Sequence, residues 1–99
     1  MAKQAETNFK ERVLRDLATL PGIWFFKTQM RATRGIPDVI ICLHGHFVAL
    51  ELKRSAKEGP TKLQEHILKQ ISAAHGLSML AHPTNWDNIF STLKHMQET

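Results

Sequence analysis

Apolar residues recur along the chain with two different periods, and the change between them predicts alternating helices and strands. Phe9, Val13 and Leu17 follow the helical period and predict an amphipathic first helix. Short runs rich in β-branched, aromatic and aliphatic residues predict strands. The expected helices are 6–20, 62–74 and 85–96, and the expected strands are 23–29, 37–43, 47–53 and 77–81.

The order of the predicted elements, α-β-β-β-α-β followed by a C-terminal helix, favours an α/β fold. The first three strands have short connections and should pair antiparallel, whereas the third and fourth flank a helix and should be parallel. We therefore expect a mixed sheet flanked by helices, with the first two helices on opposite faces. A chain of 99 residues fits one domain over 1–99 with a single modest core.

The link between the second and third predicted strands fixes a hairpin register. A two-residue turn at His44-Gly45 pairs residues whose numbers sum to 89, so that Asp38 faces Glu51. Strand alternation places Lys53 on the face of Glu51. Two opposed carboxylates in apolar strands are costly unless they bind a cation, and such a site, holding Mg²⁺, suits phosphodiester hydrolysis. The alternative is a structural salt bridge between Lys53 and one acid.

The motif Gly35-Ile36-Pro37-Asp38, followed by Glu51-Leu52-Lys53, resembles the active-site signature of the PD-(D/E)XK nuclease superfamily. Within that superfamily the chain resembles the VRR-Nuc family in its short stand-alone form from phages and bacteria, over nearly its whole length. The resemblance implies a restriction-endonuclease-like core. It also implies that Asp38, Glu51 and the backbone carbonyl of Leu52 bind Mg²⁺ or Mn²⁺, and that Lys53 is catalytic.

Two further positions match this family. Glu6 stands where the family has a glutamate early in the first helix, which implies a direct or water-mediated metal ligand. The alternative is a solvated N-terminal turn that benefits from the helix dipole. Gln64 matches a glutamine near the start of the helix after the Glu-x-Lys motif, which implies a place in the catalytic site. Its alternative is a capping partner of Thr61.

The net charge of +4 is concentrated in residues 27–62, which hold seven of the 13 basic residues and three of the nine acids. A localised basic segment suits a phosphate backbone, although excess lysine also serves solubility. The candidate DNA contacts are Arg31, Arg34, Lys57 and Lys62, each of which alone also fits a solvated surface charge. The aromatic run 24–26 allows stacking on bases or, alternatively, a place in the core or an interface.

Together these features predict a metal-dependent endonuclease that hydrolyses DNA. Stand-alone family members resemble Holliday-junction resolvases, which implies selectivity for branched DNA, and cutting two strands from one-site subunits favours a homodimer. Three alternatives stay open. They are a related nuclease with a flap, nick or sequence-specific target, a non-catalytic nucleic-acid-binding module, and a basic regulatory or toxin-type protein.

The sequence also predicts a cytoplasmic location, in a bacterium or a phage-infected host cell. Its longest apolar run, 39–43, is far shorter than a membrane helix, and its N-terminus has no apolar signal-peptide core. The single cysteine, Cys42, has no partner in the chain and fits a buried residue in a reducing compartment.

Overall fold

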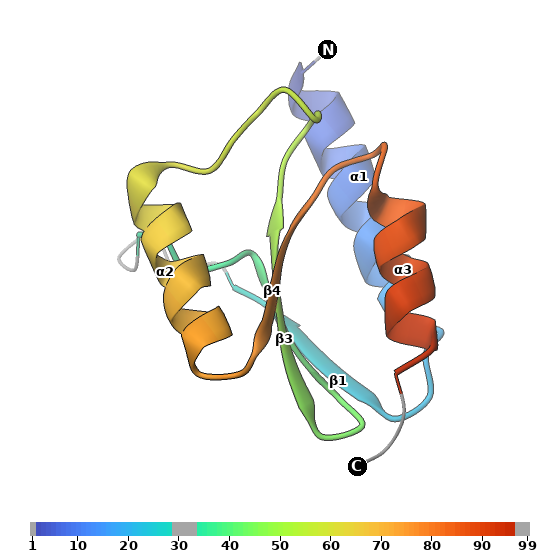
Figure 1. The fold of residues 1–99 in the computed structure, drawn as a ribbon. Coiled ribbons are helices and arrows are strands. Elements are labelled where there is room, and N and C mark those ends of the chain that lie inside the picture. The colour runs from blue at the N-terminus through green and yellow to red at the C-terminus, as the bar shows by residue number, and fades with distance from the viewer. Residues whose placement is uncertain (1, 29–33, 97–99) are drawn as a thin grey trace.

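The computed structural model describes residues 2–28 and 34–96 and has the α/β architecture expected from the sequence, a four-stranded mixed sheet flanked by helices (Figure 1). None of the helices in the described part of the chain is long and apolar enough to cross a membrane. The elements are α1 (Ala2–Leu17), β1 (Ile23–Lys27), β2 (Val39–Leu43), β3 (His46–Leu52), α2 (Lys62–Ala73), β4 (Leu77–Ala81) and α3 (Trp86–Lys94).

The strands lie in the order β1-β2-β3-β4. β2 pairs antiparallel with both β1 and β3, and β3 pairs parallel with β4, as the connection lengths predicted. Figure 1 shows α1 and α3 together on one face of the sheet and α2 on the other. The expectation that the first two helices lie on opposite faces is therefore confirmed.

Several element boundaries differ from the predicted ones. α1 begins at Ala2 instead of residue 6, and it ends at Leu17 because the chain tightens there into short turns. β2 begins two residues later than predicted, since Pro37 has no N–H to donate to a ladder. Pairing nevertheless continues just outside the strands, where the Thr28 amide donates to the Asp38 carbonyl over 2.9 Å.

The β2–β3 hairpin has the predicted register, with Val39 opposite Leu50 and the turn at His44-Gly45. Both turn residues have positive φ, 50° and 86°, as a type I′ turn requires. His44 is an unusual residue for this position. The backbone N–H of His44 donates a 3.0 Å hydrogen bond to the Gly22 carbonyl. A side chain at Gly22 would clash with the His44 ring.

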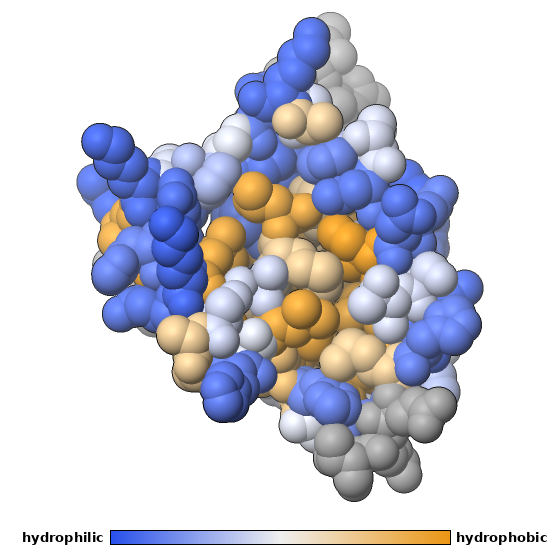
Figure 2. All heavy atoms as spheres, in the orientation of Figure 1, coloured by the Kyte–Doolittle hydropathy of each residue, from blue (hydrophilic) through white to orange (hydrophobic). Residues whose placement is uncertain are grey.

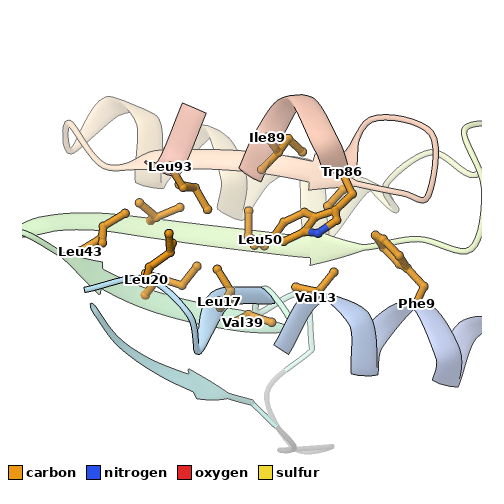
Figure 3. Close-up of a cluster of buried hydrophobic side chains, with 13 residues drawn as sticks. Phe9, Val13, Leu17, Leu20, Val39, Leu43, Leu50, Trp86, Ile89 and Leu93 are labelled. Carbon is orange, nitrogen blue, oxygen red and sulfur yellow. The ribbon is translucent and has the colours of Figure 1, made fainter. Parts of the chain in front are cut away.

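The core lies between one face of the sheet and the helices α1 and α3. Figure 3 shows Phe9, Val13 and Leu17 of α1 and Trp86 and Leu93 of α3 directed toward each other over the sheet. The sheet side of this core is formed by alternate residues of β2 and β3, none more than 1% exposed: Val39, Ile41, Leu43, Val48 and Leu50. Nearly all of the buried apolar side chains in the described residues therefore lie on the face of the sheet that α1 and α3 cover.

Two side-chain contacts join α1 to α3, and they differ in burial. The indole N–H of Trp86, a fully buried residue, donates to Asp16 Oδ2 over 2.8 Å. Arg12 forms an ion pair of 2.8 Å with Asp87, whose side chain is 90% exposed. Solvent screens the second contact, whereas the first satisfies a polar group that has no access to water.

We predict that Asp16→Ala lowers the free energy of unfolding by about 1–3 kcal/mol, because it leaves the buried indole N–H without an acceptor. Asp16→Asn keeps an acceptor oxygen and should recover most of this loss. Arg12→Ala is the matched control and should cost less than about 1 kcal/mol. Urea unfolding measures all three; equal losses for Asp16→Ala and Arg12→Ala would contradict the assignment.

Candidate metal centre

Asp38 and Glu51 stand opposite each other where the β2–β3 hairpin opens, one pair beyond Val39 and Leu50. Asp38 Oδ2 accepts a 2.8 Å hydrogen bond from the Leu52 amide, which turns its carboxylate across to β3. Glu51 is only 4% exposed and is the one buried charged residue in the described part of the chain. The predicted opposition of two carboxylates on one sheet face is thus present.

A lysine and a glutamine complete the cluster around Glu51. Lys53 Nζ lies 3.7 Å from Glu51 Oε2, and Gln64 Nε2 donates to the same oxygen over 2.8 Å. Lys53 Nζ also donates to Gln64 Oε1 over 2.9 Å. The Lys53 side chain is 13% exposed, so its ammonium is held by these contacts with little access to water. The sequence-predicted residues Asp38, Glu51, Lys53 and Gln64 therefore lie together.

Gln64 takes both of the roles that the sequence offered as alternatives. Thr61 is the N-cap of α2, and its hydroxyl accepts from the Gln64 amide over 3.1 Å. In return Gln64 Oε1 accepts from the Thr61 amide over 2.9 Å, which closes a capping box. The same Oε1 accepts from Lys53 while Nε2 reaches Glu51, so the start of α2 is tied to the acidic pair.

The environment raises the pKa of Glu51 from 4.5 to about 7. Burial is the largest cause, because it disfavours the charged carboxylate, and the nearby Asp38 charge raises the pKa further. Lys53 lowers the pKa but does not offset the other two effects. The cluster thus places Glu51 where its negative charge lacks sufficient compensation from the protein.

The donor set of this cluster suits a hard divalent cation. Glu51 Oε1 is buried and has no hydrogen-bond partner among the described residues, so one carboxylate oxygen is left for a ligand. No group of three His, Cys, Asp or Glu side chains that could hold a metal occurs in residues 2–28 and 34–96. Mg²⁺ commonly uses only one or two carboxylates and completes its sphere with water and substrate oxygens, so Asp38 and Glu51 fit it.

The structure shows no contact between the acidic pair and the side chains of the other residues that the sequence suggested for the site, among the residues it describes. Leu52 contributes its amide to Asp38, and the metal-binding role of its carbonyl stays a prediction. Glu6 lies in α1, but its side chain is outside the described part of the structure, as is Arg31 altogether. The remaining basic candidates, Arg34, Lys57 and Lys62, are all exposed.

Lys62 lines a surface hollow on α2 with Glu65, His66 and Lys69, whereas Gln64 is directed to the acidic pair. Lys62 therefore lies beside the cluster on the same helix without contributing to it. Arg34 precedes Gly35, whose φ of 81° is available to glycine and whose missing side chain leaves room for Leu63 of α2. This close approach brings the start of α2 to the segment that carries Asp38.

Sequence reasoning missed the part played by Thr28. Its hydroxyl donates to the Pro37 carbonyl over 2.7 Å, and its amide donates to the Asp38 carbonyl. These bonds fix the backbone of the segment before β2 against the end of β1, so that the Asp38 carboxylate is aimed at β3. A threonine at the end of a strand carries no sequence signal for such a role.

A cavity of about 620 Å³ lies elsewhere in the structure. It is formed by the hairpin turn and the C-terminal half of α2, with Phe47, Ile67 and Ile71 among its lining residues. Its titratable groups are His46 and His75, and it contains neither carboxylate of the cluster. The charge arrangement, and not the size of the hollow, identifies the candidate centre.

Comparisons with protein families, with curated proteins and with solved structures found no match. The geometry of the cluster therefore carries the functional argument.

We predict that replacing Glu51 by glutamine stabilises the metal-free protein at neutral and alkaline pH. The folded protein holds a proton on Glu51 between pH 4.5 and about 7 that the unfolded chain releases, so stability falls as the pH rises through this window. At ~1.4 kcal/mol per pKa unit the full shift corresponds to roughly 3 kcal/mol. Glu51→Gln removes this penalty.

Urea unfolding in chelator at pH 5 and pH 8 tests this prediction. The wild-type protein should lose stability between the two values, and Glu51→Gln should lose less. Glu11→Gln, an exposed carboxylate on α1, is the matched control and should follow the wild type. If Glu51→Gln is less stable than the wild type at pH 8, the ionised Glu51 carboxylate does not destabilise the folded protein, and the prediction is wrong.

Proposed function

We propose that this protein is a metal-dependent endonuclease that hydrolyses DNA phosphodiester bonds. One observation carries the proposal: two opposed carboxylates, one of them buried with an unpartnered oxygen, lie beside a lysine held by hydrogen bonds. This arrangement matches the chemistry that the resemblance to PD-(D/E)XK and VRR-Nuc nucleases implies. The restriction-endonuclease-like character of the core belongs to the same proposal.

Each residue of the cluster has a distinct part in the proposed reaction. Asp38 and Glu51 would hold the divalent cation, Mg²⁺ or Mn²⁺, which would make a bound water more acidic and stabilise negative charge on the phosphate. The hydrogen bond from Lys53 to Gln64 Oε1 fixes the position of the ammonium. From there Lys53 can donate a hydrogen bond to the attacking water or to a phosphate oxygen. Gln64 acts through the other two residues by fixing Lys53 relative to Glu51.

The substrate side of the proposal is DNA of branched or junction type, cut by a homodimer. The basic segment 27–62 supplies sequence-independent attraction to phosphates. A dimer supplies a second site for the second strand. β4 is an edge strand, and Figure 2 shows apolar atoms gathered along the band between α2 and α3 in which it lies. An uncovered strand edge of this kind offers pairing to another chain.

We predict that Asp38→Asn and Lys53→Ala each reduce Mn²⁺-dependent DNA cleavage by at least about 100-fold while largely sparing DNA binding. The first removes the negative charge of a proposed cation ligand, and the second removes a proposed donor to the reacting phosphate. Lys69→Ala is the matched control, because Lys69 is an exposed lysine on α2 that forms an ion pair with Glu65. Cleavage is measured on four-way junction, flap and linear duplex DNA, with chelator as the blank.

The outcome separates the proposal from its alternatives. Cutting that persists in both variants would refute the assignment of the site. Binding without cutting by the wild type, in either metal, would favour a non-catalytic nucleic-acid-binding module. The substrate panel distinguishes junction cutting from flap, nick or sequence-specific cutting, and a protein that neither binds nor cuts any DNA would favour the basic regulatory alternative.

A second prediction separates the two roles of Gln64. Thr61→Ala removes the capping hydroxyl but leaves the contacts from Gln64 to Lys53 and Glu51, so it should cost about 1 kcal/mol of stability with near-normal cleavage. Gln64→Ala keeps the bond from its backbone amide to the Thr61 hydroxyl, but it removes the reciprocal half of the capping box and the contacts to Lys53 and Glu51 together. It should cost a similar amount of stability and, in addition, lower kcat at least roughly tenfold. Equal cleavage by the two variants would show that Gln64 is only a cap.

A further inference from the structure

Two aromatic side chains project from β1 on the face of the sheet that carries the candidate metal centre. Trp24 is 62% exposed and Phe26 is 47% exposed. Their ring planes are nearly parallel, 13° apart, with centroids separated by 6.2 Å. Phe25, between them, is directed to the other face and packs against the core. Exposed apolar side chains that lie together, unlike ones scattered singly, are typical of interaction surfaces.

The position of α2 explains why this pair is uncovered. α2 packs on β4, where the Ser78 hydroxyl donates to the Leu68 carbonyl over 2.9 Å. It thus stands over the β4 end of the sheet, whereas Trp24 and Phe26 of β1 are exposed on this face. Cys42, the cross-strand neighbour of Trp24, is exposed for the same reason. The open face is bounded on one side by α2 and carries Trp24 and Phe26 on the other.

The pair is close to the acidic cluster along the strands. Phe26 is opposite Ile40, and the next row on the same face contains Thr28 and Asp38. With a rise of about 3.3 Å per residue and about 4.8 Å between strands, Phe26 is roughly 8 Å from Asp38 and Trp24 roughly 14 Å, measured between Cα atoms. These separations correspond to only a few nucleotides of an extended strand.

We propose that Trp24 and Phe26 form a stacking platform for unpaired bases next to the phosphate that is cut. The inference rests on the proposed function and adds a substrate class, DNA with unpaired nucleotides at or beside the cleavage point. Aromatic rings stack on any base, but bases within a continuous duplex are already stacked and cannot reach them. The platform therefore selects flaps, bulges and opened branch points over intact duplex without reading a sequence.

A second copy of the chain is the other possible occupant of this surface. A second copy bound to Trp24 and Phe26 would also cover the sheet face next to them, and DNA needs access to this face to reach Asp38. The basic charge of the segment 27–62 likewise complements phosphates, whereas two copies of it would repel each other. Continuity with the acidic cluster and charge complementarity both favour a DNA strand.

Tryptophan fluorescence tests the proposal directly, because the chain has two tryptophans and Trp86 is fully buried. A short oligothymidylate is titrated into the wild-type protein at low salt, in chelator, so that no cutting takes place. Stacking on Trp24 should quench its emission saturably. A duplex of the same length should quench it far less.

Variants that remove or keep the rings provide the control. Binding of fluorescein-labelled oligothymidylate to Trp24→Ala/Phe26→Ala should be weaker than to the wild type by roughly tenfold or more. Trp24→Phe/Phe26→Tyr keeps both rings and should restore most of the affinity. Circular dichroism and urea unfolding confirm that each variant is folded, as expected for changes at exposed positions.

Three results would overturn the platform. They are the absence of quenching by oligothymidylate, unchanged affinity of the double alanine variant, and emission that changes with protein concentration alone while the alanine variant turns a dimer into a monomer. The last result would assign the surface to a second copy. Binding is measured without metal, so these results test only the platform. The proposed nuclease function is tested separately, by cleavage of DNA by the wild type in Mn²⁺.

Discussion

The opposition of Asp38 and Glu51 across the β2–β3 ladder is the constraint on which the candidate site depends. The two-residue turn at His44-Gly45 sets the register, and a slip of one residue would move one carboxylate to the core face. Burial raises the pKa of Glu51 because water is replaced by protein without a matching positive charge. The fold thus holds an arrangement that a bound cation would relieve.

Local structure at the start of α2 is coupled to this pair through a single side chain. Gln64 completes the capping box of the helix and also bonds to Lys53 and Glu51. Fraying of the first turn would therefore also release the lysine from its position. Gly76, in the link from α2 to β4, lets the end of this helix lie close to the sheet, since a side chain there would crowd Ile71 and Phe47. The site thus lies at the ends of strands β1, β2 and β3 and at the start of α2, where hydrogen bonds extend beyond the regular elements.

The sequence predicts the strand pairing and the acidic cluster because both follow from short-range rules. Turn length fixes the register, and alternation then assigns Glu51 and Lys53 to one face. It does not predict which aromatic residues of β1 are buried, because Trp24 and Phe25 differ only in which face the helices cover. The sequence also does not predict the hydrogen bond between Thr28 and Asp38, because it joins the end of a strand to a segment ten residues away.

The two faces of the sheet divide stability from chemistry. α1 and α3 bury one face, where the side chains are apolar and Trp86 is satisfied by Asp16. The other face carries the buried acid, the lysine and the exposed aromatic pair, with α2 packed on β4 and bonded to Glu51 of β3. A strained carboxylate costs stability, so it can persist only where the opposite face supplies a sufficient core. The packing of α1 and α3 is therefore what allows Glu51 to remain buried beside Asp38.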